Sequence, residues 1–331
     1  MIGLLFMGFS KKNIRELLDT VGLYEDSEDI YEQKNIVLRD GRNAILWENK
    51  TNGHGILDPE FWEKSNYYQE DYRKEFSANL NNFTNSKDHL EIYKGLNKRQ
   101  YEQFAHMITH STRFLEIGCS FGGIISLVNQ NSLSCIHGIE PNKYDSEFIA
   151  NKLSSARIFN STFEEFEPND VIYDLIVSFE VLEHVINLSD FVIKLSKCLE
   201  RGGFINIEVP NHNDALLKYY KNCAYEKFYY HKAHIHYFTP KSLNNLFALH
   251  GFEGSISSFQ IYPFFNQVFW IYNNKPQASA TEALSYPKIS VINCHEELEI
   301  NKFFDDTQAK YLELMNQYLI GDSLVYSGRK L

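Results

Sequence analysis

Short apolar runs alternate with amphipathic segments from residue 111 onward, and this alternation predicts strands that are each followed by a helix. The expected strands are 113–117, 134–140, 156–159, 173–178 and 204–209. The expected helices are 124–128, 143–153, 188–199 and 242–250. Residues 252–259 and 268–272 could add a closing antiparallel hairpin. Such an order is typical of an α/β fold, a parallel sheet covered by helices on both faces.

The region before residue 111 has a different pattern of apolar and polar residues. Residues 11–23 carry apolar side chains at helical spacing and stop at Gly22. Residues 35–49 have the pattern of a hairpin that turns at Asp40 and Gly41. A small unit with one helix and one hairpin is therefore expected ahead of the main sheet.

The linking and final regions are mostly helical in pattern. Residues 59–110 are polar and aromatic, with a helix expected over 98–110, and residues 295–319 predict one long amphipathic helix. The run 323–331 is β-like, which would suit a piece of a longer protein. We therefore divide the chain into four parts. They are a small N-terminal α+β unit (1–58), a helical lid segment (59–110), a central α/β domain (111–274) and a C-terminal helical extension (275–331).

Charge and composition narrow the functional classes. The 331 residues include 32 Lys and Arg against 43 Asp and Glu, a net charge of −11, which argues against a nucleic-acid binder and against attachment to anionic lipid. No apolar stretch is long enough to span a membrane. The five cysteines are widely spaced, without a CxxC pair, and the N-terminus lacks the features of a signal peptide. A reducing, cytoplasmic location without membrane insertion is expected.

The segment FLEIGCSFGG, residues 114–123, is the strongest chemical signal. A strand enters a glycine turn that opens a helix, and such turns approach dinucleotides or S-adenosylmethionine closely. Glu116 separates these ligands, because a carboxylate repels a pyrophosphate and attracts the α-ammonium group of S-adenosylmethionine. Glu140 follows Gly118 by 22 residues, at the end of the next strand, where an acid can accept hydrogen bonds from a ribose diol.

Four segments, in order, resemble class I S-adenosylmethionine-dependent methyltransferases: FLEIGCSFGG, GIEPN, YDLIVSFEVLEHV and LERGGFINIEVPN. The resemblance covers about 61–273, and its flanks are similar to a subgroup from bacterial surface-polysaccharide and secondary-metabolite clusters. It implies a Rossmann-like, doubly wound, mostly parallel seven-stranded sheet with a closing antiparallel hairpin. It also makes 111–274 the cofactor-binding domain. Ser120 departs from the family pattern, since many members carry glycine there.

The resemblance also implies roles for individual residues around S-adenosylmethionine. Glu116 is expected to orient its amino group through the turn. A backbone cradle for the methionine part is expected from Gly118, Ser120 and Gly122, and a contact with the ribose is expected from Glu140. The residues expected to flank the adenine are Thr162, Phe163 and Phe179. Cys119 lies in the same turn, is counted with these residues, and is expected to be chemically inert because no base stands beside it.

His184 is the candidate catalytic residue. A sugar hydroxyl is a poor nucleophile at neutral pH and benefits from a general base, and His184 follows the fourth strand, whose end faces the ligand crevice. The alternative is a histidine that supports the fold. Glu180 could face the substrate, while Glu183 could brace a loop.

Further residues are candidates for acceptor binding. Tyr67 and Tyr68 could form an aromatic lid, or simply pack, and Asn211 could bind a substrate hydroxyl. His234 and His236 share a face if extended, and they could contact substrate or anchor their segment. A divalent metal held by these histidines with His184 or Glu180 is a further alternative, but we assign no metal.

These features favour an S-adenosylmethionine-dependent methyltransferase acting on a small polar acceptor. The expected acceptor is a hydroxyl of a sugar or nucleotide-linked sugar of a bacterial surface polysaccharide. The alternatives are an N-methyltransferase for a small amine, a non-catalytic S-adenosylmethionine-binding module and an NAD-dependent oxidoreductase. A nucleic-acid methyltransferase is disfavoured by charge and by SFEVLEH in place of a (D/N)PP(Y/F) motif. The terminal extensions could form a homodimer.

Overall fold

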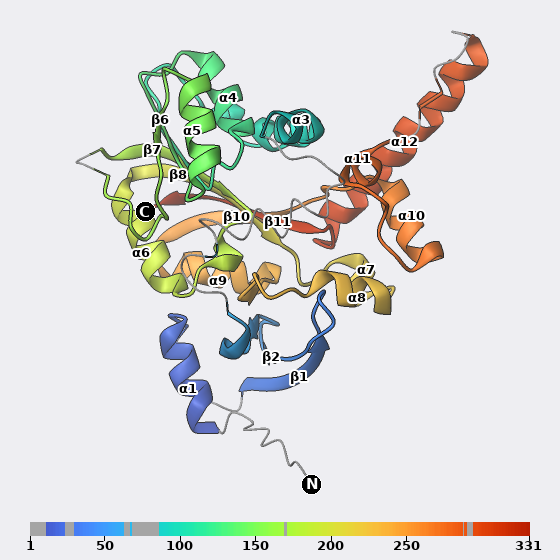
Figure 1. Cartoon of the computed structure of the whole chain (residues 1–331), viewed down its shortest axis with the longest axis horizontal. Coiled ribbons are helices and arrows are strands. Elements are labelled where there is room, and N and C mark those ends of the chain that lie inside the picture. Colours follow the sequence, from blue (N-terminus) through green and yellow to red (C-terminus); the bar gives the residue numbers. More distant parts are fainter. Residues whose placement is uncertain are drawn as a thin grey trace.

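A seven-stranded sheet forms the centre of the computed structural model, which describes residues 11–23, 30–62, 67, 86–168, 171–286, 288–289 and 294–331 (Figure 1). Its strand order is β10-β11-β8-β7-β4-β5-β6. The strands are β4 (Arg113–Ile117), β5 (Cys135–Ile139), β6 (Arg157–Phe159), β7 (Tyr173–Phe179), β8 (Leu199–Pro210), β10 (Phe252–Phe259) and β11 (Ser323–Lys330). Strands β4 to β8 are parallel, and β11 runs antiparallel to both β8 and β10. The predicted Rossmann-like, mostly parallel fold is confirmed.

Helices cover both faces of this sheet (Figure 1). One core contains Phe114 and packs under α4 (Gly123–Val128) and α5 (Lys143–Lys152). The next residue, Leu115, belongs to a second core with α6 (Leu188–Cys198) and α9 (Pro240–Leu249). Neighbouring side chains of a strand point to opposite faces, so the apolar runs read from the sequence bury both faces of the sheet.

A second, four-stranded sheet contains the N-terminal hairpin. Its order is β1-β2-β3-β9, from β1 (Tyr31–Val37), β2 (Asn43–Asn49), β3 (Gly55–Leu57) and β9 (His236–Tyr237). The hairpin predicted at Asp40 and Gly41 is confirmed, and helix α1 (Lys11–Thr20) precedes Gly22, which adopts a φ of 70°. Because β9 pairs with β3, the segment that carries His236 is fixed to the N-terminal sheet.

One sequence prediction about the central sheet is wrong. The expected strand 268–272 lies in helix α10 (Phe264–Asn273), because short apolar runs do not distinguish strand from helix. The closing strand is instead β11, which lies between β8 and β10. The β-like run near residue 323 therefore completes the central sheet, although it lies in the segment predicted to be a helical extension.

The other described α-helices lie outside the central sheet. They are α3 (Ser86–Glu102), α7 (Ala215–Lys218), α8 (Cys223–Tyr229), α11 (Ala280–Leu284) and α12 (His295–Gln317). Helix α3 begins earlier and ends earlier than the predicted 98–110, whereas the long helix expected from residue 295 is confirmed as α12.

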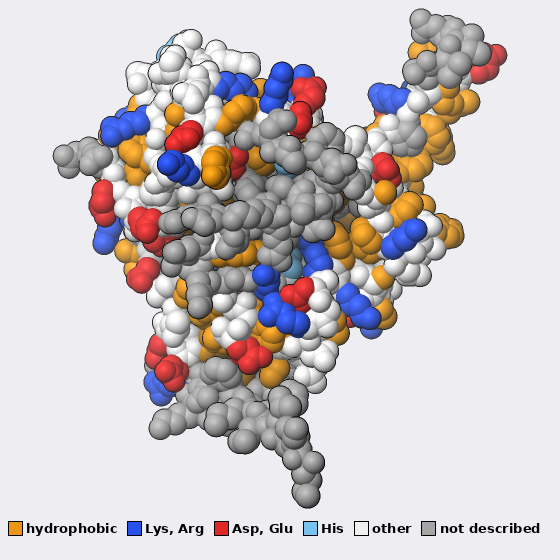
Figure 2. Space-filling view, in the orientation of Figure 1, with side chains coloured by type: hydrophobic (Ala, Val, Ile, Leu, Met, Phe, Trp, Pro, Cys, Tyr) orange, Lys and Arg blue, Asp and Glu red, His pale blue; other side chains and the backbone are white. Residues whose placement is uncertain are grey.

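Helix α12 projects from the body, and hydrophobic side chains gather along it (Figures 1 and 2). Leu298, Phe303 and Tyr318 are each more than half exposed. The homodimer through terminal extensions stays a prediction. Among the described helices, none combines the length and the apolar character needed to cross a bilayer.

Packing in the central sheet can be tested at Ile207 of β8, which is fully buried. We expect Ile207→Val to lower the free energy of unfolding by about 0.5–1.5 kcal/mol, because one buried methylene is lost. The matched control is Ile193→Val on α6, where the side chain is 41% exposed and the expected change is below about 0.5 kcal/mol. Urea denaturation followed by circular dichroism measures both, and equal losses would contradict this placement of the core.

Candidate active site

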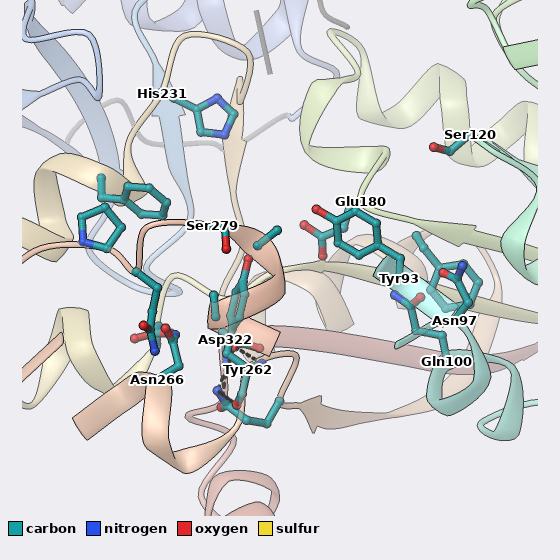
Figure 3. Close-up of a pocket in the computed structure, with 18 of the residues that line it drawn as sticks. Tyr93, Asn97, Gln100, Ser120, Glu180, His231, Tyr262, Asn266, Ser279 and Asp322 are labelled. Atoms are coloured by element: carbon teal, nitrogen blue, oxygen red, sulfur yellow. Dashed lines mark hydrogen bonds between the residues drawn. The ribbon is translucent and has the colours of Figure 1, made fainter. Parts of the chain in front are cut away.

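A cavity of about 890 Å³ opens at the carboxyl ends of β4, β7 and β8. One end is formed by the glycine turn and by α3, including Glu116, Gly118, Ser120, Asn97 and Gln100. The other end is formed by α7, α8 and α10, including Asp214, Tyr225, Asn266, Gln267 and Trp270. Figure 3 shows Ser120 and Asn97 on one side, Asn266 on the other, and Glu180 between them. The volume is typical of sites that bind small molecules, and Glu180 lies between the two ends.

The glycine turn leaves no room for side chains at two positions. Gly118 has a φ of 75°, and a Cβ there would overlap the side chain of Val181. At Gly123 a Cβ would overlap Asn97, because α3 packs directly against the start of α4. Backbone N–H groups can therefore approach a ligand closely at this end of the cavity.

Glu116 is a buried carboxylate on the cavity wall, and only 3% of its surface is exposed. Its Oε2 has no hydrogen-bond partner among the described residues. Burial raises the pKa of Glu116 to about 8, and the nearby charge of Glu140 contributes in the same direction. An unpaired carboxylate in such a place is stabilised by a cationic ligand, so the site fits the α-ammonium group of S-adenosylmethionine.

Glu140 stabilises the glycine turn by accepting hydrogen bonds from backbone N–H groups. Its Oε2 accepts a hydrogen bond from the N–H of Ser120 at 2.7 Å, and its Oε1 accepts one from the N–H of Asn142 at 2.8 Å. These bonds hold Ser120 at a φ of 48°, a left-handed conformation that a non-glycine residue adopts only when its surroundings fix it. The contact between Glu140 and the ribose of the cofactor stays a prediction.

The predicted adenine-flanking residues divide into two groups. Phe179, at the end of β7, lines the cavity. Phe163 instead packs in the core against Phe191, with ring centroids 4.8 Å apart, and Thr162 caps a local turn by accepting from the N–H of Glu165. Neither Thr162 nor Phe163 forms part of the cavity wall, so their adenine contacts stay predictions.

Glu180, which directly follows β7, is the carboxylate between the two ends of the cavity. It adopts a φ of 56°, its Oε1 accepts a hydrogen bond from the hydroxyl of Ser323, and burial raises its pKa to about 7. His184 lies outside the cavity wall: its Nδ1 donates to the carbonyl of Ala233 at 2.7 Å, and burial lowers its pKa to about 4. Glu180 is therefore better placed than the predicted His184 to receive a proton from an acceptor.

Three predicted acceptor residues instead have clear structural contacts. Asn211 is fully buried, and its amide donates to the carbonyls of Leu319 and Gly321, which braces the loop before β11. His236 is hydrogen-bonded to His54 at 3.0 Å. Tyr67 is buried, with the ammonium group of Lys232 placed 5.2 Å from its ring centroid. Tyr68 lies outside the described residues.

Several cavity residues were missed by the sequence analysis. His89, Tyr93, Asn97 and Gln100 form a polar stripe along α3 with spacings of four, four and three residues, a helical signal that could have been noticed. The ring of His89 stacks on Phe121 of the turn, with centroids 4.3 Å apart.

Asp322 also belongs to the cavity wall, although it lies far along the chain. It accepts hydrogen bonds from the N–H groups of Ile261 and Tyr262 and from the side chain of Gln260, and burial raises its pKa to about 8. No local pattern links it to the turn, because the insertion of β11 into the sheet is what brings it there.

Residues 62–255 match a protein-family model described as a methyltransferase domain. The chain belongs to this methyltransferase family. Among curated relatives, the ubiquinone biosynthesis O-methyltransferases of Dictyostelium discoideum and Rickettsia prowazekii are 29% and 30% identical over 140 and 103 residues. These alignments cover 38% and 30% of this chain and only 42% and 40% of the relatives. The chain thus spans about two fifths of the length of the curated relatives it matches.

Solved methyltransferase structures are also similar to this chain. An S-adenosylmethionine-dependent methyltransferase from Archaeoglobus fulgidus has a TM-score of 0.48 at 17% identity, over 72% of this chain and 94% of that one. The plantazolicin methyltransferase BpumL, crystallised with a substrate analogue and S-adenosylhomocysteine, has a TM-score of 0.46 at 14% identity, over 80% and 92%.

The residues around the glycine turn fit S-adenosylmethionine as the cofactor. When bound, the cofactor supplies an activated methyl group together with its leaving group, so the protein mainly binds, orients and excludes water. Glu116 would supply the negative charge for its ammonium group, and the turn around Gly118 would permit close backbone contact. Phe179 supplies an apolar surface on the cavity wall beside Glu180.

Proposed function

We propose that this methyltransferase acts on a hydroxyl of a small polar acceptor, namely a sugar or nucleotide-linked sugar of a bacterial surface polysaccharide. The observation that carries the proposal is a pair of buried amides at the far end of the cavity. Asn266 and Gln267 are each 6% exposed and line the cavity. Their Oδ1 and Oε1 atoms have no hydrogen-bond donor among the described residues. A ligand with several hydroxyl groups would supply those donors.

Aromatic rings surround these amides. Trp270 lies 5.1 Å from the ring centroids of both Tyr225 and Phe228, and all three line the cavity. Broad aromatic surfaces beside fixed polar groups are typical of sites that orient small polar molecules. This composition supports a ring-shaped, hydroxylated acceptor.

Methyl transfer to a hydroxyl requires removal of its proton. The acceptor oxygen gains the methyl group, and its proton passes to the carboxylate of Glu180, the acid–base group between the two ends of the cavity. The predicted base, His184, is retained as a proposal of lower priority because it does not line the cavity and its Nδ1 donates to the carbonyl of Ala233.

We expect Asn266→Leu to raise the KM for the acceptor roughly tenfold while leaving the Kd for S-adenosylmethionine unchanged. A hydrogen bond to a buried polar group contributes about 1–3 kcal/mol, and leucine cannot make it. Asn273→Leu is the matched control, since Asn273 is exposed on the same helix. Initial rates with a panel of nucleotide sugars measure the effect. An unchanged KM in Asn266→Leu, or no turnover of any hydroxylated acceptor, would argue against the proposal.

An N-methyltransferase for a small amine is the second candidate. The acidic residues Glu180, Asp214 and Asp322 on the cavity wall favour it, because they could attract a cationic acceptor. However, Asp214 and Asp322 already accept hydrogen bonds from protein donors. Mass spectrometry of the product formed from an amino sugar decides between methylated nitrogen and methylated oxygen.

A further inference from the structure

Glu183 is a carboxylate buried without a compensating donor. It belongs to the short helical turn η6 (Leu182–His184) after β7, and none of its surface is exposed. Neither carboxylate oxygen has a hydrogen-bond partner among the described residues. An uncompensated buried charge of this kind is strongly unfavourable, so either a proton or a cation is expected at this position.

Two histidines face this carboxylate. The Nε2 atom of His184 lies 3.6 Å from Glu183 Oε1, and the Nε2 atom of His234 lies 3.7 Å from the same oxygen. Both distances exceed a normal hydrogen bond. The ligand atoms of Glu183, His184 and His234 all lie within 4.8 Å of one another. Two nitrogen atoms and one oxygen atom therefore lie close enough together to share one ion.

The hydrogen bond of His184 fixes which nitrogen can bind an ion. Its Nδ1 lies 2.7 Å from the carbonyl of Ala233, which can only accept, so Nδ1 carries the proton. In the neutral ring, Nε2 then presents a lone pair toward Glu183. Metal-binding histidines usually donate their other ring N–H to a carbonyl or carboxylate in this way.

We propose that Glu183, His184 and His234 bind a divalent transition-metal ion through one carboxylate oxygen and two imidazole nitrogens. Bonds of about 2.0–2.2 Å in tetrahedral geometry separate the ligand atoms by roughly 3.4 Å, close to the observed 3.6 and 3.7 Å. Zinc and its neighbours in the first transition series accept such a mixed set of ligands. Glu180, whose carboxyl group lies beside that of Glu183, lines the cavity next to the site.

The site would connect two parts of the cavity wall. His234 lies in the segment before β9, close to His231, with ring centroids 3.6 Å apart, and His231 lines the cavity. Glu183 and His184 lie in the turn that follows Glu180. An ion between them would fix the acceptor side of the cavity relative to the end of β7. This structural role does not depend on the chemical identity of the acceptor.

Isothermal titration of chelator-treated, full-length protein with Zn²⁺, without cofactor or acceptor, tests the proposal. We expect one equivalent to bind, and we expect His234→Ala and Glu183→Gln each to weaken this binding at least about tenfold. The control is His250→Gln, because the ring of His250 is hydrogen-bonded to Ser189 on another part of the domain. This variant should bind Zn²⁺ as tightly as the wild type does. Co²⁺ provides a second reading, because its visible spectrum distinguishes nitrogen and oxygen ligands from cysteine thiolates.

Two outcomes would overturn the site. In the first, the wild type binds no equivalent of Zn²⁺, and Glu183 then holds a proton shared with Glu180. In the second, both ligand variants bind as tightly as the wild type, and the ion then lies elsewhere. Circular dichroism of each variant checks that it is folded, and the wild-type titration decides even if a variant does not fold. Since no acceptor is present, failure here leaves the proposed methyl acceptor untouched.

Discussion

Above about pH 8, where Glu116 is ionised, replacing it by glutamine is expected to weaken S-adenosylmethionine binding by about a thousandfold. A carboxylate and an ammonium group about 4 Å apart attract each other by roughly 4 kcal/mol at an effective dielectric constant of about 20, and glutamine carries no charge. Glu116 is buried, so little of this attraction is screened by solvent. Isothermal titration gives the Kd for wild type and variant. Glu147→Gln is the matched control, since Glu147 is largely exposed on α5.

The raised pKa of Glu116 adds a pH dependence to the same measurement. Burial places the pKa of the ligand-free carboxyl group at about 8, so at pH 7 most molecules hold a proton there. A cationic ligand favours the ionised form, so binding at pH 7 should release close to one proton. Affinity should rise with pH until about 8 and then level off. Titrations in buffers of different ionisation heat count the proton, and no release in the wild type would falsify the assignment of Glu116 to the ammonium group.

Replacing Glu180 by glutamine is expected to lower kcat by about 10²–10⁴-fold, because a positioned general base contributes that much to proton removal. Glutamine keeps the size of the side chain and an oxygen that can accept from Ser323, so the local fold should survive. The Kd for S-adenosylmethionine should change by less than about twofold. Single-turnover kinetics with a hydroxyl acceptor separate the chemical step from binding.

The control for this variant is Glu253→Gln, since Glu253 is exposed on β10. An unchanged kcat in Glu180→Gln would show that another group accepts the proton. A rise in KM at constant kcat would instead assign Glu180 to acceptor binding alone.

The centre of the fold was predictable because its signals are local. Apolar runs of strand length, ended by glycine or proline, place β4 at its observed bounds and locate the second half of β8, which begins earlier, at Leu199. The turn at Gly118 and the charge of Glu116 also lie within a few residues of each other. Local interactions therefore determine both the strands and the end of the cavity that the glycine turn forms.

Contacts between segments that lie far apart in the sequence could not be predicted from local sequence patterns. The run near residue 323 was recognised as β-like, but nothing local indicates that it lies between β8 and β10. The same limit explains Asn211, which follows a strand as expected but uses its amide on the loop before β11. Whether a polar side chain faces a cavity or braces a loop depends on partners far along the chain.

The position of β11 has a consequence for the order in which the molecule assembles during synthesis. Until residue 330 has left the ribosome, β8 exposes an unpaired edge, and Asp322 is missing from the cavity wall. Exposed edges of this kind invite pairing with other chains. The nascent chain can therefore form its glycine turn early, but the central sheet and the cavity wall are finished only after β11 inserts between β8 and β10, a stage at which chaperone protection would matter most.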